Sequence, residues 1–476
     1  MRLKTKLLFF MCLPLMVTAC QDDDIFSTSS ANRLVFSVDT VKLDTVFSNV
    51  PTATKTFWAY NPASDGVRLS SVRLEQGTTS GYRVNVDGVY LGETSGYSAS
   101  DIEVHRKDSI RVFVELTAPE NGLEGPQRHD DNLIFTLEND TEQHVSLSAY
   151  TWDATVMRNV RISHDSILAD NGKPIIIYGG IIVDSTATLT LAAGTTLYFH
   201  NDAGIDVYGS LHCEGTAGSE VVLRGDRIDR MFSYLPYDRT PGQWQGIHLY
   251  PSARDNRLKY TDLHSAYNGI IADSSAIEKD KLWLSSVTIH NCQGYGLWAK
   301  SCNVTMENTV VSNTLGDCVR LDNAVATVNQ CTLAQFYPFD ANRGVALRFA
   351  ANEASSLIIR NTLITGYADD ELMGGHSDST ATARYHFDHC IIRTPKVETA
   401  DSTNFVSVNF ENVKDTTMYG EKHFVKLDTD NLIYDFRLKA SSSAIDKADP
   451  LTALPTDRLG VKRDERPDVG AYEWFK

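Results

Sequence analysis

Two insertions between short β-like runs carry side chains that suit carbohydrate binding or cleavage. They span residues 334–344 and 366–386, and both combine carboxylates with aromatic or cationic groups. Hydrolysis of a glycoside needs two carboxylates, whereas elimination on a uronic acid needs a base together with calcium-binding acids or cations. The candidate ligand-binding residues are Tyr337, Asp340, Arg343, Asp369, Asp370 and His376. Solvated polar loops are the competing interpretation, and no residue is assigned a catalytic role.

The sequence predicts no metal site and identifies no cofactor, although a lyase would call for calcium. His264, His290 and His389 recur along the chain, but they fall on segments that are not all adjacent, and surface histidines are the favoured explanation. Six cysteines lie between residues 213 and 390, without a CxxC pair and without zinc-finger spacing to histidine. They stand where neighbouring segments carry Val, Thr or Ile, which predicts small buried core residues.

The N-terminus predicts export and lipidation. Arg2, Lys4 and Lys6 precede an apolar run, residues 7–17, which has the length of a signal peptide rather than of a membrane span. Val17-Thr18-Ala19-Cys20 resembles the lipobox of bacterial lipoproteins, which implies cleavage before Cys20 and a lipid on its thiol. The following Asp22, Asp23 and Asp24 resemble the surface-export signal of Bacteroidota lipoproteins, with a plain soluble tether as the alternative.

The acidic composition limits the class of partner. The formal net charge is −17, and loss of the three basic signal residues makes the mature chain about −20. Such a surface repels nucleic acid and anionic membrane faces, so neither is an expected partner. No other apolar stretch approaches the length of a membrane span, so lipid on Cys20 is the expected membrane anchor.

Residues 34–153 alternate apolar and polar positions in short runs, such as TKTFWAY, YRVNVDGVYL and SIRVFVEL. Turn-forming stretches separate these runs, and no helical periodicity is present, which is typical of a β-sandwich. SVDTVKLDTVFSNV and YNPAS resemble the N-terminal Ig-like domains of Bacteroidota surface proteins. Trp58, Tyr60 and Tyr82 suit either a ligand platform or the core, and aromatic residues in strands more often belong to the core.

Internal repeats dominate the rest of the chain. Aligned segments share apolar anchors at Leu263, Ile289, Val311, Leu333, Ile364 and Ile392, at intervals of 26, 22, 22, 31 and 28 residues. Three positions before the anchors stand mostly polar residues suited to a turn or an exterior ladder: Tyr260, Ser286, Asn308, Gln330, Asn361 and His389. Repeats of this length with short β-runs predict the coils of a right-handed parallel β-helix.

The C-terminal segment resembles the closing segment of secreted bacterial β-helix proteins, which include pectate-lyase-like enzymes. The resemblance rests on DFRLKASSSAIDKADP and PTDRLGVKRDERPDVGAYEWFK, with the P-D-x-G-A-Y-E pattern at residues 467–473, and on Trp244 and Gly246 in GQWQGIHL. It implies the fold but no activity. Arg463 and the neighbouring acids are expected to pair and to cap the open end of the β-helix. ADDELMGGHSD superficially resembles two polygalacturonase motifs, a double Asp and a Gly-His-Gly. The likeness is rejected because these motifs lie on successive coils in that family, whereas here both would fall within one insertion.

The sequence thus predicts an all-β protein: an N-terminal Ig-like β-sandwich followed by a right-handed parallel β-helix. The expected parts are a signal peptide (1–19), an acidic tether (20–33), the sandwich (34–153) and the β-helix with its C-terminal cap (154–476). The favoured function is a surface-exposed, lipid-anchored outer-membrane protein whose β-helix binds a glycan or another polymer. The alternatives are a polysaccharide lyase or hydrolase, and an accessory subunit docked on an outer-membrane barrel or on other surface lipoproteins.

Overall fold

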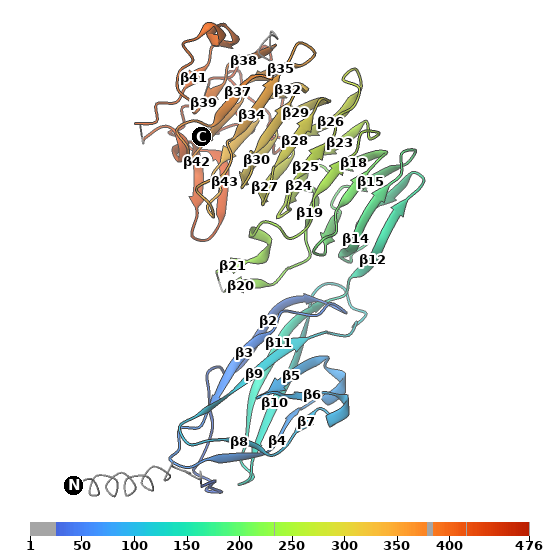
Figure 1. Cartoon of the computed structure of the whole chain (residues 1–476), viewed down its shortest axis with the longest axis vertical. Helices are drawn as coiled ribbons and strands as arrows, with labels where there is room; N and C mark the ends of the chain where they lie inside the picture. The colour runs from blue at the N-terminus through green and yellow to red at the C-terminus, as the bar shows by residue number, and fades with distance from the viewer. Residues whose placement is uncertain (1–24, 233, 378–383, 416, 476) are drawn as a thin grey trace, which may run out of the picture. The chain divides into compact units, whose positions relative to one another are not determined.

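The computed structural model describes residues 25–475 except 233, 378–383 and 416. The chain divides into two compact units, with the boundary between Asp153 and Ala154 (Figure 1). Both are built from strands and short 3-10 turns, and no α-helix occurs among the described residues. The all-β class predicted from the sequence is therefore confirmed.

The N-terminal unit has two β-sheets. One has the order β1-β3-β9-β5-β6, with β1 at Val35–Phe36, β3 at Lys55–Tyr60, β9 at Ser109–Leu116, β5 at Tyr82–Val86 and β6 at Val89–Leu91. The other has the order β2-β11-β10-β4-β7, with β2 at Thr40–Phe47, β11 at Glu142–Trp152, β10 at Gln127–Leu137, β4 at Val67–Leu74, β7 at Ser98–Ala99 and β8 (Ile102–Val104) paired to β4. All pairs are antiparallel except β2 with β11.

One hydrophobic core joins both sheets of this unit. In β9, for example, Ile110, Val112 and Val114 are buried while the residues between them face outward, as period-two alternation requires. Tyr82 belongs to this core, whereas Trp58 and Tyr60 stand exposed on β3. The three aromatic residues therefore form no common platform.

The second unit is a solenoid of parallel strands in three ladders. Ladder 1 contains β14 (Ile175–Val183), β16 (Thr196–Phe199), β19 (Val221–Gly225), β24 (Thr261–His264), β27 (Thr288–Cys292), β30 (Val310–Thr314), β33 (Thr332–Gln335), β36 (Leu363–Gly366), β39 (Ile391–Ile392) and β41 (Asn409–Phe410). Ladder 2 shares β14, which also pairs with β12 (Thr155–Ile162), and continues with β17 (Ile205–Val207), β22 (Ile247–Leu249), β25 (Ile270–Ala272), β28 (Leu297–Lys300), β31 (Val319–Asp322), β34 (Leu347–Ala351) and β37 (Leu372–His376).

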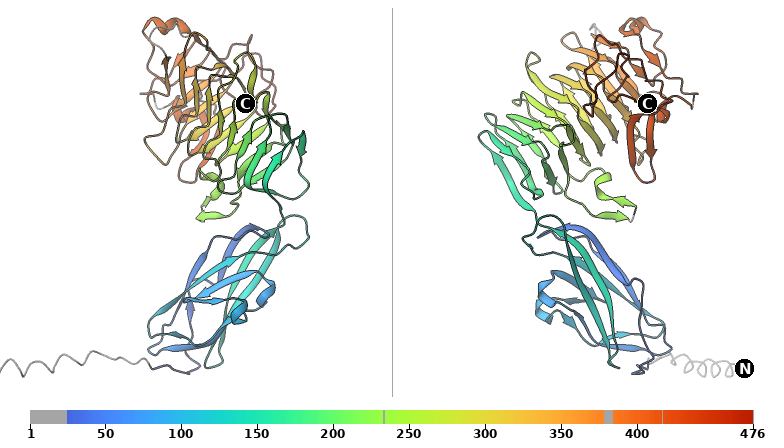
Figure 2. Two further views of the ribbon diagram at one scale, coloured as in Figure 1. Left: turned by 45° about the vertical axis from the view of Figure 1, so that its right-hand side comes forward. Right: turned by 180° about the vertical axis from the view of Figure 1, so that it is seen from behind.

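Ladder 3 closes each coil and returns the chain to ladder 1 (Figure 2). It contains β13 (Ser166–Leu168), β15 (Thr188–Ala192), β18 (Ser210–Glu214), β23 (Asn256–Lys259), β26 (Asp280–Ser285), β29 (Asn303–Glu307), β32 (Val325–Asn329), β35 (Ser356–Arg360), β38 (Tyr385–Asp388) and β40 (Phe405–Val406). Parallel strands stacked coil upon coil are the architecture of a β-helix.

The predicted repeat register is confirmed residue by residue. Leu263 pairs with Ile289, Ile289 with Val311, Val311 with Leu333, Leu333 with Ile364, and Ile364 with Ile392. All six anchors are buried. Like residues therefore stack on like along the solenoid axis, and each coil completes the core of its neighbours.

The polar positions before the anchors are sharp turns between ladders 3 and 1. All six have the left-handed backbone conformation, with φ from 41° at Tyr260 to 58° at Ser286. Asparagine and other polar residues tolerate this conformation better than branched ones do. Of the two alternatives for these positions, a turn or an exterior ladder, the structure shows the turn. The six cysteines are free and buried, and burial raises the pKa of Cys213 to about 12, so they are core residues as expected.

The C-terminal segment lies along the flank of the solenoid and bonds to several successive coils. Asn308 and Asn329 donate to the carbonyl oxygens of Thr456 and Thr452, and Ala471 N–H donates to Thr332 Oγ1. The hairpin of β42 (Phe424–Asp428) and β43 (Ile433–Leu438) packs Phe424 and Phe436 in a cluster with residues of β30, β33 and β36. The expected pairing of Arg463 with a neighbouring acid is confirmed by its 2.9 Å contact with Glu473, but the segment packs its apolar side chains along ladder 1 instead of lying over the end of the solenoid.

Candidate functional site

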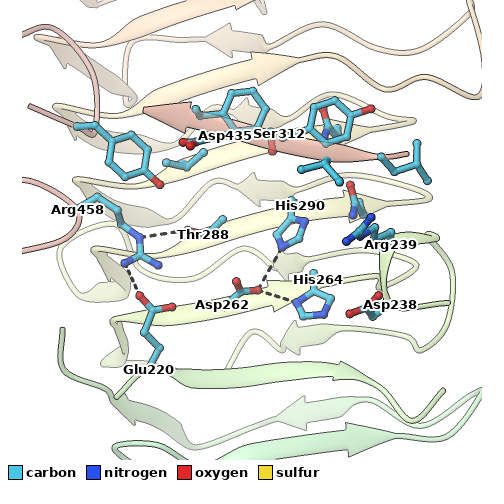
Figure 3. A pocket seen from close by; sticks show the side chains of 18 of the residues that line it. Glu220, Asp238, Arg239, Asp262, His264, Thr288, His290, Ser312, Asp435 and Arg458 are labelled. Carbon is cyan, nitrogen blue, oxygen red and sulfur yellow. Dashed lines mark hydrogen bonds and ion pairs between the residues drawn. The ribbon is translucent and has the colours of Figure 1, made fainter. Parts of the chain in front are cut away.

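A cavity of about 470 Å³ lies on the outward face of ladder 1 in the second unit (Figure 3). We call it the flank cavity. Its floor comes from β24, β27 and β30, and the residues that line it are Glu220, Asp238, Arg239, Asp262, His264, Thr288, His290, Asn291, Val310, Ser312, Asn313, Leu432, Ile433, Tyr434, Asp435, Phe436, Arg458, Leu459 and Tyr472. A cavity with a few convergent charged groups is the default location for a ligand site.

Strand geometry fixes which side chains form the floor. Leu263 points into the solenoid core, so Asp262 and His264 on either side of it point outward. On the next coil, Thr288 and His290 occupy the same positions, because Asp262 pairs with Thr288 and His264 with His290. The coil after that contributes Ser312, which pairs with His290. The floor is therefore a regular grid of side chains on rigid strands.

Irregular segments form the walls. The insertion between β19 and β22 contributes Asp238 and Arg239, and it contains the small hairpin of β20 (Arg230–Phe232) and β21 (Leu235–Pro236). Arg239 Nη1 donates to the carbonyl oxygen of Asn431 at the tip of the β42–β43 hairpin, at 2.8 Å. Two segments far apart in the sequence are thus linked at the margin of the cavity.

Asp262 lies between two imidazoles. Its Oδ1 is 2.7 Å from His264 Nδ1 and 3.3 Å from His290 Nε2, and the two rings stack with centroids 4.9 Å apart. Burial alone would raise the pKa of the Asp262 carboxyl, but the two imidazoles outweigh it and hold that pKa well below its usual range. Burial lowers the pKa of His264 despite the adjacent carboxylate, which favours a neutral imidazole.

Arg458 forms the other charged corner of the cavity. Its Nη1 is 2.8 Å from Glu220 Oε1, and its Nε donates to Thr288 Oγ1 at 3.1 Å. The guanidinium is nearly fully buried, with 3% of the side chain exposed. Since one ion pair and one hydrogen bond already engage it, its chief role is to hold the C-terminal segment on the floor of the cavity.

Several buried polar atoms around the cavity have no hydrogen-bond partner among the described residues. They are Asp238 Oδ1, Ser312 Oγ, Asn313 Oδ1, Asn313 Nδ2 and Tyr434 OH. Burial raises the pKa of Tyr434, so its hydroxyl keeps its proton and can donate. Buried polar groups are nearly always satisfied in native proteins, so a cluster of unsatisfied ones beside a cavity indicates a polar ligand or ordered water.

The six predicted ligand-binding residues do not line the flank cavity. Tyr337 is 4% exposed and Asp340 is exposed, while Arg343 donates to the carbonyl oxygens of Tyr337 and Asp340 in its own loop. The end of the loop is tied to the preceding coil, since the buried Asp317 carboxylate accepts a hydrogen bond from Val345 N–H. Tyr337 is therefore a packing residue, and its burial contradicts its prediction as a ligand-binding side chain.

The second insertion is held together by bonds within the chain. Asp369 forms a 3.6 Å ion pair with Arg393, and Asp370 accepts a hydrogen bond from Thr394 Oγ1 at 2.7 Å. His376 is the last residue of β37, and an extended strand separates it from Asp370 by roughly 3.3 Å for each intervening residue. Arg343 lies over the ring of Tyr367, 4.8 Å from its centroid, so the two insertions are neighbours. They do not bring all six candidates together.

Glu371 is the most perturbed acid of this region, and sequence analysis did not single it out. It is fully buried, and burial raises its pKa to about 7 even though its oxygens accept hydrogen bonds from Ala346 N–H and Ala368 N–H. These two bonds tie the second insertion to the start of β34. Its function is thus to position the loop.

The prediction that these histidines lie at the surface is wrong for His264. His264 and His290 occupy equivalent positions on adjacent coils of ladder 1, whereas His389 lies at the turn that enters ladder 1. His264 is 8% exposed, so it is no surface residue. The aligned repeats contained the signal: Leu263 and Ile289 are each followed by histidine, and Asp262 precedes one of them. The hairpin that covers them, residues 424–438, had no such signal.

The residues of the predicted lipidation and export signals, Cys20 and Asp22 to Asp24, lie outside the described part of the chain. Among the residues that the structure does describe, no helix has the length and apolar character needed to cross a membrane.

Comparison with known proteins gives no family. No protein-family model matches the sequence, and no curated protein matches it either. A search of solved structures finds the catalytic unit of an α-1,3-glucanase of glycoside hydrolase family 87 from Streptomyces thermodiastaticus, at 10% identity and a TM-score of 0.21, covering 74% of this chain and 87% of that one.

Two further solved structures each match less than a third of the chain. A family 123 glycoside hydrolase from Clostridium perfringens has 10% identity and a TM-score of 0.18, and the match covers 27% of this chain and 26% of the hydrolase. A PapD-like domain of human CEP192 has the same identity and TM-score, over 29% of this chain and 96% of that domain. Scores this low do not indicate a shared fold, so nothing about these three proteins is carried over to this chain.

Proposed function

We propose that this protein binds a saccharide chain in the flank cavity while a lipid on Cys20 anchors it at the outer surface of a Bacteroidota outer membrane. The observation that carries the binding proposal is the set of unpartnered polar atoms on Asp238, Ser312, Asn313 and Tyr434. Sugar hydroxyls both donate and accept, so they can satisfy a mixed set of carboxylate, hydroxyl and amide groups. The apolar side chains of Leu432 and Phe436 offer a surface for the C–H face of a sugar ring.

The remaining parts of the proposal come from sequence resemblance. The fold of residues 34–153 is proposed to be Ig-like, and the solenoid is proposed to be right-handed, as nearly all parallel crossovers are. The N-terminal unit then serves as a spacer between the membrane and the solenoid. The proposed binding rests on the polar and apolar side chains of the cavity and does not require a metal or other cofactor.

A second candidate function is polysaccharide cleavage in the same cavity. The observation that favours it is the grouping of Asp262, His264 and His290, because carboxylates and imidazoles are the usual acids and bases of enzymes. A lyase acting on uronic acids releases an unsaturated product that absorbs ultraviolet light. Purified protein incubated with uronate polymers would distinguish a lyase from a binding protein, which leaves the absorbance unchanged, and a reducing-end assay of the same mixtures would detect a hydrolase.

The binding proposal predicts a specific effect of removing two hydroxyls. Ser312→Ala and Tyr434→Phe each delete one unpartnered polar atom with little change of shape, so each should weaken saccharide binding about 3- to 10-fold, the equivalent of one hydrogen bond. Neither change should lower the free energy of unfolding, because the deleted atom has no partner within the described chain. A glycan array first identifies the oligosaccharides that the wild-type protein binds. Calorimetry with these oligosaccharides then measures the affinity of each variant.

Thr365→Val is the matched control for this experiment. Thr365 is buried on ladder 1, two coils beyond Ser312, and its hydroxyl is also unpartnered among the described residues, but it does not line the cavity. Binding should be the same as in the wild-type protein. If Ser312→Ala and Tyr434→Phe bind every glycan identified with the wild-type protein as tightly as the control does, the flank cavity is not the saccharide site.

The export proposal predicts an effect of the acidic run on topology. Changing Asp22, Asp23 and Asp24 to alanine should leave the lipidated protein facing the periplasm and protect it from protease added to intact cells. Changing all three to glutamate keeps the negative charge and should keep the protein accessible. Equal digestion of the alanine variant and the wild type would reduce the run to a soluble tether.

A further inference from the structure

We infer that Asp262, His264 and His290 bind one divalent transition-metal ion, of which Zn²⁺ is the representative, with an open coordination position toward the flank cavity. The inference goes beyond saccharide binding and does not depend on it. It replaces the expectation that the chain has no metal site.

The ligand atoms have the spacing of a single metal centre. Oδ1 of Asp262, one ring nitrogen of His264 and one ring nitrogen of His290 all lie within 4.8 Å of one another. Asp262 Oδ1 lies 2.7 Å from His264 Nδ1 and 3.3 Å from His290 Nε2. Zinc binds nitrogen and oxygen ligands at about 2.0–2.2 Å, which places neighbouring ligand atoms about 3 Å apart. Both imidazoles thus present a nitrogen to the same carboxylate oxygen (Figure 3).

The solenoid preorganises all three ligands. Asp262 and His264 lie two residues apart on β24 and so share one face, and His290 is the paired neighbour of His264 on β27. Trp244, which is 1% exposed, donates from Nε1 to the carbonyl oxygen of His264 at 2.8 Å and thereby supports the strand. Gly246 permits the chain to pass close to this coil, since its φ is 92° and a Cβ there would lie 1.6 Å from Asn268 O.

A second, independent observation indicates a ligand beside this group. Ser312 is 0% exposed and Asn313 is 1% exposed, both line the cavity, and their side-chain polar atoms lack partners among the described residues. On the next coil of ladder 1, Ser312 pairs with His290. A water or hydroxyl on the open position of the metal would have these groups as hydrogen-bond partners.

Charge and ligand type select the class of ion. Of the four carboxylates that line the cavity, Glu220, Asp238 and Asp435 each pair with an arginine, whereas Asp262 contacts the two imidazoles and is the carboxylate available to a cation. Two imidazoles and one carboxylate suit zinc and its transition-metal neighbours, whereas calcium and magnesium prefer oxygen ligands alone. Three protein ligands with an open position are also the pattern of reactive rather than purely structural zinc sites.

The test uses the full-length protein, purified in detergent without an affinity tag and treated with a chelator. Titration with ZnCl₂ in a calorimeter should show one site per chain, and zinc should raise the melting temperature while CaCl₂ and MgCl₂ should not. His290→Gln and Asp262→Asn should each weaken zinc binding by more than about 100-fold, because loss of an outer-shell partner alone costs 10- to 100-fold. The zinc-dependent rise in melting temperature should be lost with it.

His248→Gln is the matched control. His248 lies on β22 and pairs with Asp273 at 2.8 Å, but Lys300 contacts the same carboxylate at 3.1 Å, so a cation is already in place there. This variant should bind zinc as the wild type does. The inference is overturned if the wild-type protein binds no zinc at one per chain, or if both ligand variants bind it unchanged; the Asp262 group is then a hydrogen-bonded cluster. Because no saccharide is present, this result leaves the glycan proposal to its own test.

Discussion

Cys20→Ser is expected to move the protein from the membrane fraction to the soluble fraction. A single acyl chain holds a protein on a membrane only weakly, with an association constant of about 10⁴ M⁻¹, and stable anchoring takes at least two. The proposed lipid on Cys20 supplies several chains at once, and its loss leaves no anchor of comparable strength. Fractionation of cells followed by immunoblotting measures the distribution.

Cys12→Ser provides the control for this variant. Cys12 lies in the apolar run of the proposed signal peptide, so its replacement should change neither lipidation nor distribution. A Cys20→Ser protein that stays in membranes after washing with high salt and carbonate would contradict the lipid anchor. Release by high salt alone would instead indicate a bound membrane partner, as expected of an accessory subunit.

Glu473→Ala is expected to destabilise the second unit by about 3–5 kcal/mol, because it leaves the buried Arg463 guanidinium without its counter-charge. The two side chains are 2% and 1% exposed and lie 2.9 Å apart. Arg463 also donates to Asn308 Oδ1 and Gly470 O, so it joins the C-terminal segment to the solenoid. Burial already lowers the pKa of Arg463, and loss of the carboxylate would disfavour its charged form further.

The measurement is hydrogen exchange in increasing urea, with peptides from residues 154–475 followed separately from those of the N-terminal unit. Arg466→Ala is the matched control, because Arg466 pairs with Asp446 at 3.2 Å but is 76% exposed. Its loss should change the free energy of unfolding by less than about 1 kcal/mol. The double variant Arg463→Met/Glu473→Leu should recover much of the loss, since it leaves no unpaired charge. Equal effects of Glu473→Ala and Arg466→Ala would show that the buried pair does not hold the segment in place.

The flank position of the C-terminal segment explains its unusual content of acids. Asp457, Asp468 and Glu473 accept hydrogen bonds from backbone amides of the segment itself, such as those of Val461, Trp474 and Asp464. Burial raises the pKa of Asp468 to about 7. The conspicuous motif at the end of the sequence is thus structural: it fixes irregular backbone on a regular surface and so completes one wall of the flank cavity.

The sequence by itself determined the repeating part of the fold. Leu263, Ile289 and Val311 recur because each coil must bury an apolar residue against the same residue of the next coil, and this requirement acts over one repeat. The left-handed turns at Asn308 and Asn361 were predictable for the same reason, since the turn recurs with the coil and accepts few residue types. The buried cysteines followed from the identity of their aligned neighbours.

Only the tertiary structure decided the candidate site. Arg458 meets Glu220 and Thr288 across more than a hundred residues, and Arg239 meets Asn431 in the same way, through segments that have no repeat. The local sequence pattern does not predict which ladder such a segment will cover, because its position depends on how Phe424 and Phe436 pack against the outward face of ladder 1. Tyr337 was predicted wrongly for a related reason, because the local pattern does not determine whether a side chain of a long insertion stays accessible or packs against the solenoid. His264 and His290 were visible in the sequence as a repeat, but the hairpin that turns them into the floor of a cavity was not.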